Sequence, residues 1–279
     1  QLFQTGPRIL PTEDEDVSVA VAAAFRESGI VVHENFGAIE SFEKTPSGVR
    51  MIFSKNGERD SAEASLVVAA VGWAANTAGL NLESVGVETD HRGFVRTDAY
   101  LRTSAPNIFA AGDITGRLLL VPQAIQDGFV AATNAVQHAT MALADQVSPI
   151  GSFTDPEYAQ VGLTESKARE SHDVLTAVVQ FDSTTRTIID GHTVGFCKLI
   201  VDRVSCKILG CHVVGERAVE ITQVAAIAIA AGMRVDELAH VPLSFPTYAG
   251  ILGRVAASAA RQLKLEVSSQ AHQAERTLP

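Results

Sequence analysis

The segment Ile108-Phe109-Ala110-Ala111-Gly112-Asp113 is the feature that most constrains the fold of this chain. Its apolar run predicts a β-strand, and Gly112 allows a tight turn that places the Asp113 carboxylate at the carboxyl edge of a sheet. A carboxylate there accepts hydrogen bonds from ligand hydroxyls, and the N-terminus of a following helix favours an anion. Because an isolated Gly-Asp pair is usually only a turn, this interpretation depends on the surrounding sequence.

The first half of the chain alternates segments typical of strands and helices, which predicts an α/β fold. A capping residue and four carboxylates at 11–16 precede an Ala/Val-rich run, which predicts a helix ending near Gly29. The continuous apolar run 66–72 predicts a buried parallel strand. Further predicted elements are strands at 2–4, 30–33, 94–95 and 108–111, a meander over 37–63 with a turn at 55–57, and a helix over 124–143.

The second half has a different pattern, with alternating strands followed by helices. Strands are predicted around 174–181, 195–201 and 208–214, and helices at 218–231, 235–239 and 248–263. This order is typical of an antiparallel α+β domain. Residues 266–279 are polar and lack periodicity, so they are expected to form a flexible tail.

Composition excludes several classes of partner. A net charge of -10 and a pI near 5.3 disfavour a nucleic-acid or anionic-membrane surface and favour a small-molecule partner. No apolar run approaches the roughly 18 residues of a transmembrane helix. Three cysteines are too few and odd in number for a secreted disulfide scaffold, so a cytoplasmic location is expected. The start at Gln1, without an initiator Met, predicts a fragment.

The context of the Gly-Asp turn carries a family resemblance. Residues 103–113, Thr-Ser-Ala-Pro-Asn-Ile-Phe-Ala-Ala-Gly-Asp, resemble the second flavin motif of the pyridine nucleotide-disulfide oxidoreductases. The resemblance implies that Gly112 forms the turn and that Asp113 bonds the ribitol of FAD. It also implies that the backbone of Pro122, Gln123 and Ala124 lies against the pyrimidine end of the isoalloxazine.

The resemblance extends over essentially the whole chain and implies its domain organisation. Residues 153–162 resemble the opening of the family's interface domain, which forms a homodimer in its members. The expected fold is a partial α/β FAD- and NAD(P)-binding region followed by an α+β dimerisation domain. We expect residues 1–65 to end the NAD(P)-binding domain, 66–146 to end the FAD-binding domain, and 147–265 to form the interface domain.

The NAD(P) site is less defined by the sequence. Residues 4–11 resemble the segment after the second strand of the family's nucleotide domain, where members that select NAD carry an acid at the position of Gln4. Gln4 can bond a ribose hydroxyl but has no charge, so NAD and NADP both remain open. The loop after Gly72, the other NAD(P) candidate, departs from the family pattern, because Trp73 replaces the usual Arg and Ala75 the usual Pro.

Cys206 and Cys211 have the C-x4-C spacing of the family's redox-active disulfide. Their context is wrong, because the family's pair opens a helix near the N-terminal flavin fingerprint, whereas this pair crosses a predicted hairpin. We therefore interpret both as structural cysteines. A metal site formed with His212 is a minor alternative whose spacing fits no common zinc pattern, so no metal is expected.

The segment 245–250 lies where the family has its C-terminal proton-transfer site, but the proton-carrying residues are substituted. Phe245 stands where classical disulfide reductases carry a histidine, and Gly250 stands where they carry its acidic partner. Lipoamide- or glutathione-type chemistry is therefore disfavoured. Tyr248 is the remaining catalytic candidate, although an aromatic residue beside Pro more often packs, and His240 is expected to lie at the surface.

Two functions from different classes remain. In the first, NAD(P)H reduces FAD, and the flavin passes electrons to an acceptor such as a disulfide, a quinone or a metal ion such as the mercuric ion. In the second, the chain is a non-catalytic dimerisation or scaffolding module. A plain dinucleotide-binding regulator ranks last. Because the sequence contains no G-x-G-x-x-G run, the chain alone is expected to bind FAD poorly and to catalyse little.

Overall fold

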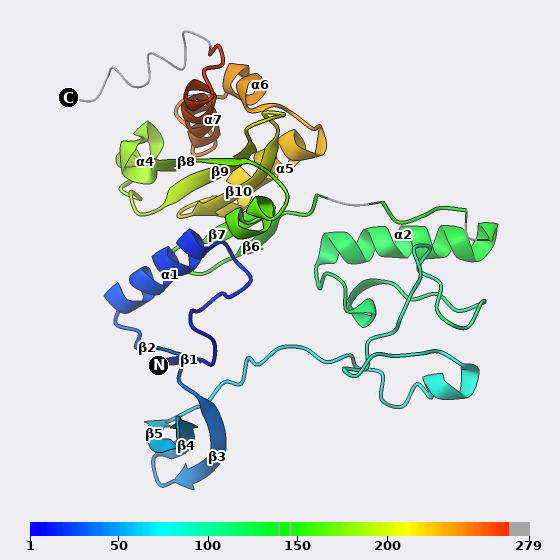
Figure 1. Cartoon of the computed structure of the whole chain (residues 1–279). Coiled ribbons are helices and arrows are strands. Elements are labelled where there is room, and N and C mark those ends of the chain that lie inside the picture. The colour runs from blue at the N-terminus through cyan, green and yellow to red at the C-terminus, as the bar shows by residue number, and fades with distance from the viewer. Residues whose placement is uncertain (139, 145–146, 268–279) are drawn as a thin grey trace. The chain divides into compact units, whose positions relative to one another are not determined.

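The computed structural model describes residues 1–138, 140–144 and 147–267 (Figure 1). Contacts divide the chain into two compact units. We call Gln1–Val67 with Pro149–Pro279 the sheet unit, and Val68–Ser148 the turn unit. Each has clusters of buried apolar side chains. No helix among the described residues is both long and apolar enough to cross a membrane.

The sheet unit begins with a strand–helix–strand segment. β1 (Leu2–Gln4) pairs in parallel with β2 (Val32–Glu34), and α1 (Glu15–Glu27) connects them. Asp14 caps α1 by accepting a hydrogen bond from the Asp16 backbone N–H. The buried residues of α1 share one face. The helix and both strands predicted for this segment are confirmed.

A three-stranded antiparallel meander follows. It contains β3 (Ala38–Thr45), β4 (Gly48–Lys55) and β5 (Glu58–Ala64) in that order. Asn56 and Gly57 have positive φ values of 54° and 86°, which suit the two-residue hairpin between β4 and β5. The rings of Phe3, Phe36 and Phe53 pack edge to face and join the meander to β1.

The rest of the sheet unit is an antiparallel sheet of order β6-β7-β10-β9-β8 with helices around it. Its strands are β6 (Ile150–Ser152), β7 (Tyr158–Gly162), β8 (Val174–Gln180), β9 (Phe196–Asp202) and β10 (Ile208–Val214). Its helices are α3 (Glu165–Arg169), α4 (Thr185–Asp190), α5 (Ala218–Ala230), α6 (Val235–His240) and α7 (Gly250–Gln262), with a 3₁₀ helix at Phe181–Ser183. The predicted α+β fold of this region is confirmed.

Both faces of the central strands are covered. Every residue of β9 and all but one of β10 are buried. Phe196 and Val214 pack with α1, and Ile200 packs with Ala168 of α3, all on one face. Residues at the alternate positions face the other side of the sheet, where α5 packs on β10 and α7 packs on β9 (Figure 1).

A buried ion-pair cluster ties α1 to this sheet. Lys198 Nζ of β9 lies 2.8 Å from Asp14 Oδ1, 2.6 Å from Asp16 Oδ2 and 2.7 Å from Glu165 Oε2, and the lysine side chain is only 3% exposed. Burial alone raises the pKa of Asp14, but hydrogen bonds from Lys198 and the Glu165 N–H outweigh it and leave the pKa below its ordinary value. Opposite charges therefore compensate one another inside the unit.

The turn unit has little regular structure. It contains α2 (Val121–Gln137) and 3₁₀ helices at Leu82–Val85 and Gly112–Thr115. The helix predicted over 124–143 thus starts earlier and ends earlier, because His138 adopts a left-handed conformation with φ 59°. The segment predicted as a strand at 94–95 contributes only an isolated bridge from Thr89 to Val95.

Two further strand predictions are wrong. Residues 66–72 form no strand, and their side chains are exposed. In the segment 108–111, Phe109 makes only an isolated bridge to Arg102. An apolar run becomes a strand when a neighbouring strand pairs with its backbone, and the described residues provide none for either segment. Of the tail predicted at 266–279, residues 268–279 lie outside the described part of the chain.

Candidate functional site

The turn at Gly112 has a geometry that requires glycine. Its φ is 73°, in the left-handed region that side chains disfavour. A Cβ at this position would lie 3.1 Å from the Cβ of Ala124, so the turn sits directly against α2. The turn continues into the 3₁₀ helix Gly112–Thr115. The structure therefore brings the Gly-Asp segment to the start of α2 within one unit.

Asp127 holds this turn in place. Its carboxylate is buried, and it accepts hydrogen bonds from Gly112 N at 3.2 Å, from Gln123 Nε2 at 2.7 Å and from Arg117 Nη1 at 3.1 Å. Neither Asp127 nor Arg117 was predicted from the sequence. The signal available was the four-residue spacing of Gln123 and Asp127, which places both side chains on one face of a helix.

The residues around the turn differ in what they offer a ligand. Asp113 and Pro122 are exposed, and no other described residue bonds the Asp113 carboxylate. The Gln123 side chain is buried and bonded to Asp127, so only its backbone is available. An exposed acceptor beside a glycine turn at a helix start fits the ribitol and ring edge of a flavin.

The two NAD(P) candidates lie in different units. Gln4 ends β1 in the sheet unit, where its Oε1 accepts a hydrogen bond from the Gly6 N–H at 3.3 Å. Gly72 lies in the turn unit, outside any helix or strand, with a positive φ of 104°. Arg8, a cation close to Gln4 in sequence, donates to the backbone carbonyls of Leu10, Pro11 and Glu13. Its guanidinium is therefore already occupied.

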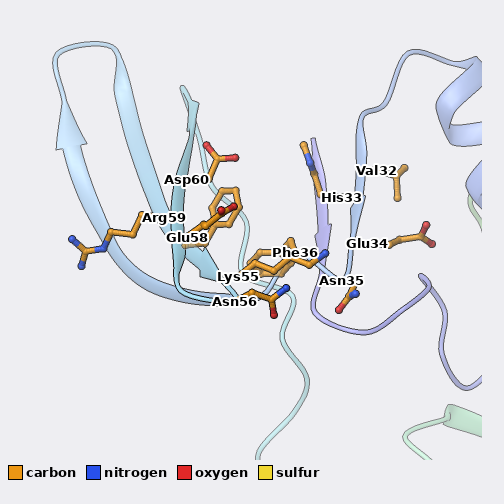
Figure 2. Close-up of a pocket in the computed structure, with 11 residues that line it drawn as sticks. Val32, His33, Glu34, Asn35, Phe36, Lys55, Asn56, Glu58, Arg59 and Asp60 are labelled. Atoms are coloured by element: carbon orange, nitrogen blue, oxygen red, sulfur yellow. The ribbon is translucent and has the colours of Figure 1, made fainter.

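A cavity of about 780 Å³ lies between β2 and the β4–β5 hairpin (Figure 2). No sequence motif predicted this cavity. Its lining carries both signs of charge and two phenylalanine rings: Val32, His33, Glu34, Asn35, Phe36, Phe53, Lys55, Asn56, Glu58, Arg59 and Asp60. Arg59 pairs with Glu40 and Glu34 pairs with Arg26, so the cavity has no single charge preference.

The loop before α7 contains no proton carrier at the two substituted positions. Phe245 is 80% exposed, and Gly250 is the first residue of α7. Tyr248 Oη donates to Asp190 Oδ2 at 3.0 Å, and its ring lies near Phe181. Burial and the neighbouring Asp190 carboxylate raise the pKa of Tyr248 to about 12. The phenol therefore stays protonated at neutral pH, with its proton directed at Asp190.

The cysteine pair lies across a hairpin, as the sequence predicted. Cys206 is in the turn between β9 and β10 with φ 60°, and Cys211 is within β10. Cys211 lies near Cys197 rather than Cys206. His212 faces the opposite side of the sheet and bonds the Leu163 carbonyl at 2.9 Å. The alternative metal site of Cys206, Cys211 and His212 is therefore not assembled in the structure.

Together, the glycine turn before α2 and the five-stranded antiparallel sheet with its helices define the class of protein. The class is part of a flavin-binding region followed by a dimerisation domain. Two family models support this. The pyridine nucleotide-disulphide oxidoreductase model matches residues 1–128, and the dimerisation-domain model of the same family matches residues 148–256. The chain belongs to the pyridine nucleotide-disulphide oxidoreductase family, whose members depend on FAD and NAD(P).

Relatives and solved structures agree with this assignment. A mercuric reductase of Staphylococcus aureus is 34% identical over 240 residues, covering 85% of this chain and 43% of the relative. A dihydrolipoyl dehydrogenase of Chlorobaculum tepidum is 34% identical over 244 residues, covering 86% and 51%. The chain spans about half the length of the curated relatives it matches.

Two solved structures share the fold. LpdA from Mycobacterium tuberculosis superposes with a TM-score of 0.81 at 27% identity, covering 92% of this chain and 55% of that one. The HOCl-induced flavoprotein disulfide reductase RclA from Escherichia coli, as its Cu(II) complex, gives a TM-score of 0.83 at 23% identity, covering 92% and 57%. At that identity the second match supports the fold alone.

Proposed function

We propose that the protein containing this chain is an FAD-dependent oxidoreductase that passes hydride from NAD(P)H to FAD and then electrons to an acceptor. The observation that carries this proposal is the glycine turn at Gly112, fixed by buried Asp127 and followed by the exposed carboxylate of Asp113. Bound FAD would supply the acceptance of hydride and the transfer of electrons. The residues of this chain would bind and orient it.

Each residue of the turn has a distinct role in this proposal. Asp113 accepts hydrogen bonds from the ribitol hydroxyls. The backbone of Pro122, Gln123 and Ala124 lies against the pyrimidine edge of the flavin. Asp127 is a positioning residue, because it holds Gly112 and Gln123 without being exposed itself.

The NAD(P) end of the proposal rests on Gln4 and Gly72. Gln4 at the end of β1 would bond a ribose hydroxyl, and its lack of charge neither repels nor attracts a 2′-phosphate. Arg8 is bonded to three carbonyls, so it adds no preference for NADP. Either nucleotide is therefore compatible with these residues.

The loop before α7 supports a preference among the possible electron acceptors. Neither Phe245 nor Gly250 can carry a proton, and the Tyr248 hydroxyl is bonded to Asp190. Among a disulfide, a quinone and a metal ion such as the mercuric ion, we favour the last two, which need no proton exchange with a dithiol. Tyr248 then acts by packing rather than by catalysis.

We further propose a cytoplasmic homodimer. The dimerisation-domain match at 148–256 supports self-association, and three free cysteines suit a reducing compartment. Sedimentation analysis tests the first point, and cell fractionation of the intact protein tests the second. A monomer at micromolar concentration would contradict the dimer.

Flavin titration separates this proposal from the scaffold alternative, which the well-packed sheet unit favours. The chain lacks a G-x-G-x-x-G run, so FAD binding to the purified protein should be weak but measurable by quenching of flavin fluorescence. Asp113→Ala should weaken it about tenfold or more, because a charge-assisted hydrogen bond is lost. Glu83→Ala, at an exposed position of the same unit, should leave binding unchanged. A dimer insensitive to FAD would support the scaffold.

A further inference from the structure

Cys197 and Cys211 form a pair of thiols in the five-stranded sheet of the sheet unit. Cys197 lies on β9 and Cys211 on β10, and their sulfur atoms are 3.9 Å apart. Cys197 is opposite Val213, and Cys211 is opposite Leu199, so the two cysteines are diagonal neighbours on one face of the sheet. Both side chains have 0% exposure.

The surroundings of this pair are apolar. The charged neighbour Lys198 and the imidazole of His212 point to the opposite face, where Lys198 binds its carboxylates and His212 bonds Leu163. On the cysteine face, α5 and α7 pack over the strands with Ala- and Ile-rich surfaces. The hydrogen bond with Cys211, together with burial, raises the pKa of the Cys197 thiol well above its ordinary value. Cys197 is therefore a poor nucleophile.

Two adjacent thiols still make a ligand pair for a soft cation, because such a cation displaces the thiol protons. A zinc ion requires four ligands, and the described residues contain no group of three or more His, Cys, Asp or Glu arranged for a metal. A soft ion that accepts two opposed ligands needs no more than this pair. If the bonds are about as long as a zinc–thiolate bond, about 2.3 Å, two sulfurs on opposite sides of the ion lie about 4.6 Å apart. The sulfurs of Cys197 and Cys211 are 3.9 Å apart, so a small separation of the two side chains accommodates the ion.

The net charge of the ion and the two thiolates favours a divalent over a monovalent cation. A monovalent cation bound by two thiolates would leave a negative charge in an apolar core, which is costly. A divalent cation bound by two thiolates leaves a neutral group. We propose that Cys197 and Cys211 form a two-sulfur binding site for a soft divalent cation, of which Hg(II) is the type. In this step two S–H bonds break, two S–Hg bonds form and two protons pass to solvent, with no change of oxidation state.

The site is independent of the proposed flavin site, because it uses no residue of the turn unit. The third cysteine provides a matched control. Cys206 is also mostly buried, but its sulfur lies against the Arg203 carbonyl in the hairpin turn and has no thiol partner. Removing Cys206 therefore changes the cysteine count without changing the pair.

The test is retention of mercury by the purified chain. Hg(II) is added to the reduced protein, free and weakly held ions are removed by gel filtration in excess glutathione, and mercury is measured by elemental analysis. The wild type and Cys206→Ala should each retain one Hg(II) per chain, with sulfur-to-mercury charge-transfer absorption. Cys197→Ala and Cys211→Ala should each lose retention, while circular dichroism confirms that both remain folded.

Two further readouts decide the proposal. Bound Hg(II) should raise the thermal midpoint of the wild type, because it binds the folded state, and Ag(I) should be lost to glutathione. Equal mercury retention by folded Cys197→Ala, loss of retention in Cys206→Ala, or a lowered midpoint would overturn the site. Silver retained as firmly as mercury would overturn the assignment to a divalent ion.

Discussion

Similar apolar segments are buried in the sheet unit and exposed in the turn unit. In the sheet unit, every residue of β9 is buried between helices on its two faces. In the turn unit, Val68 and Val71 belong to a run of the same character, yet their side chains are 79% and 88% exposed. The difference teaches that apolar sequence specifies a strand only together with the partners that cover it.

A second contrast concerns buried charge. The sheet unit buries Lys198 against three carboxylates from distant parts of the chain. The turn unit buries Asp127, whose partners all lie within 15 residues along the chain. Long-range charge compensation therefore stabilises the first unit, and local hydrogen bonding shapes the second.

Lys198→Met should give the largest change in the free energy of unfolding. The substitution leaves the buried Asp14 carboxylate without its cation, so the free energy of unfolding should fall by about 3–5 kcal/mol. Urea unfolding followed by circular dichroism measures the loss, and hydrogen exchange locates it to β9 and β10. Lys167→Met removes a pair whose lysine is 66% exposed, and it should change stability by less than about 0.5 kcal/mol. Equal effects would mean that apolar burial alone stabilises the sheet unit.

Acidification should destabilise the sheet unit through the same cluster. Burial lowers the pKa of His212, and hydrogen bonds from Lys198 lower the pKa of Asp14 and Glu165 against the effect of burial. Since all three folded-state pKa values lie below the ordinary ones, this stability is present above about pH 6.5 and is lost as pH falls through the folded values. From pH 7 to pH 4, urea denaturation should show a progressive fall in the free energy of unfolding. An unchanged midpoint over this range would contradict the prediction.

Gly112→Ala probes the turn unit. The left-handed φ and the approach to Ala124 should together cost about 1–2 kcal/mol. Gly128 in α2 has open space around it and an ordinary φ, so Gly128→Ala should stabilise by about 0.5–1 kcal/mol. Thermal unfolding of both variants measures the opposite signs. If both alanines were stabilising, the turn at Gly112 would not require glycine.

Val71→Asp should give the smallest effect. Because the Val71 side chain is 88% exposed, the change should alter the free energy of unfolding by no more than about 0.5 kcal/mol. Leu199→Ala at a fully buried position of β9 should cost about 2–5 kcal/mol. Chemical denaturation of both variants gives the comparison. A large loss from Val71→Asp would show that residues 66–72 are covered in solution.

The sequence predicted the sheet unit far better than the turn unit, for a physical reason. β9 and β10 are neighbours joined by a short turn, so the alternation at 195–201 and 208–214 and its pairing partner lie close in sequence. The run 66–72 carries an equally strong pattern without a partner strand among the described residues. Local pattern alone therefore could not distinguish a strand from exposed coil.

The candidate site was anticipated only in part. The Gly-Asp turn and residues 122–124 were identified through the family resemblance, and the structure brings Gly112 against Ala124. Asp127 was missed because a carboxylate on a helix looks like a solvated side chain until its burial is known. The Lys198 cluster was missed because Asp14 lies 184 residues away along the chain.

That separation has a consequence for the order of events during synthesis. Asp14 leaves the ribosome 184 residues before Lys198, and at about 5–20 residues per second this interval lasts roughly 10–40 s. During that time β9 and β10 do not yet exist, so Val17 and Val21 of α1 lack Phe196 and Val214 to pack against. The nascent chain therefore passes through a long stage in which part of the apolar face of α1 is uncovered and can be bound by chaperones.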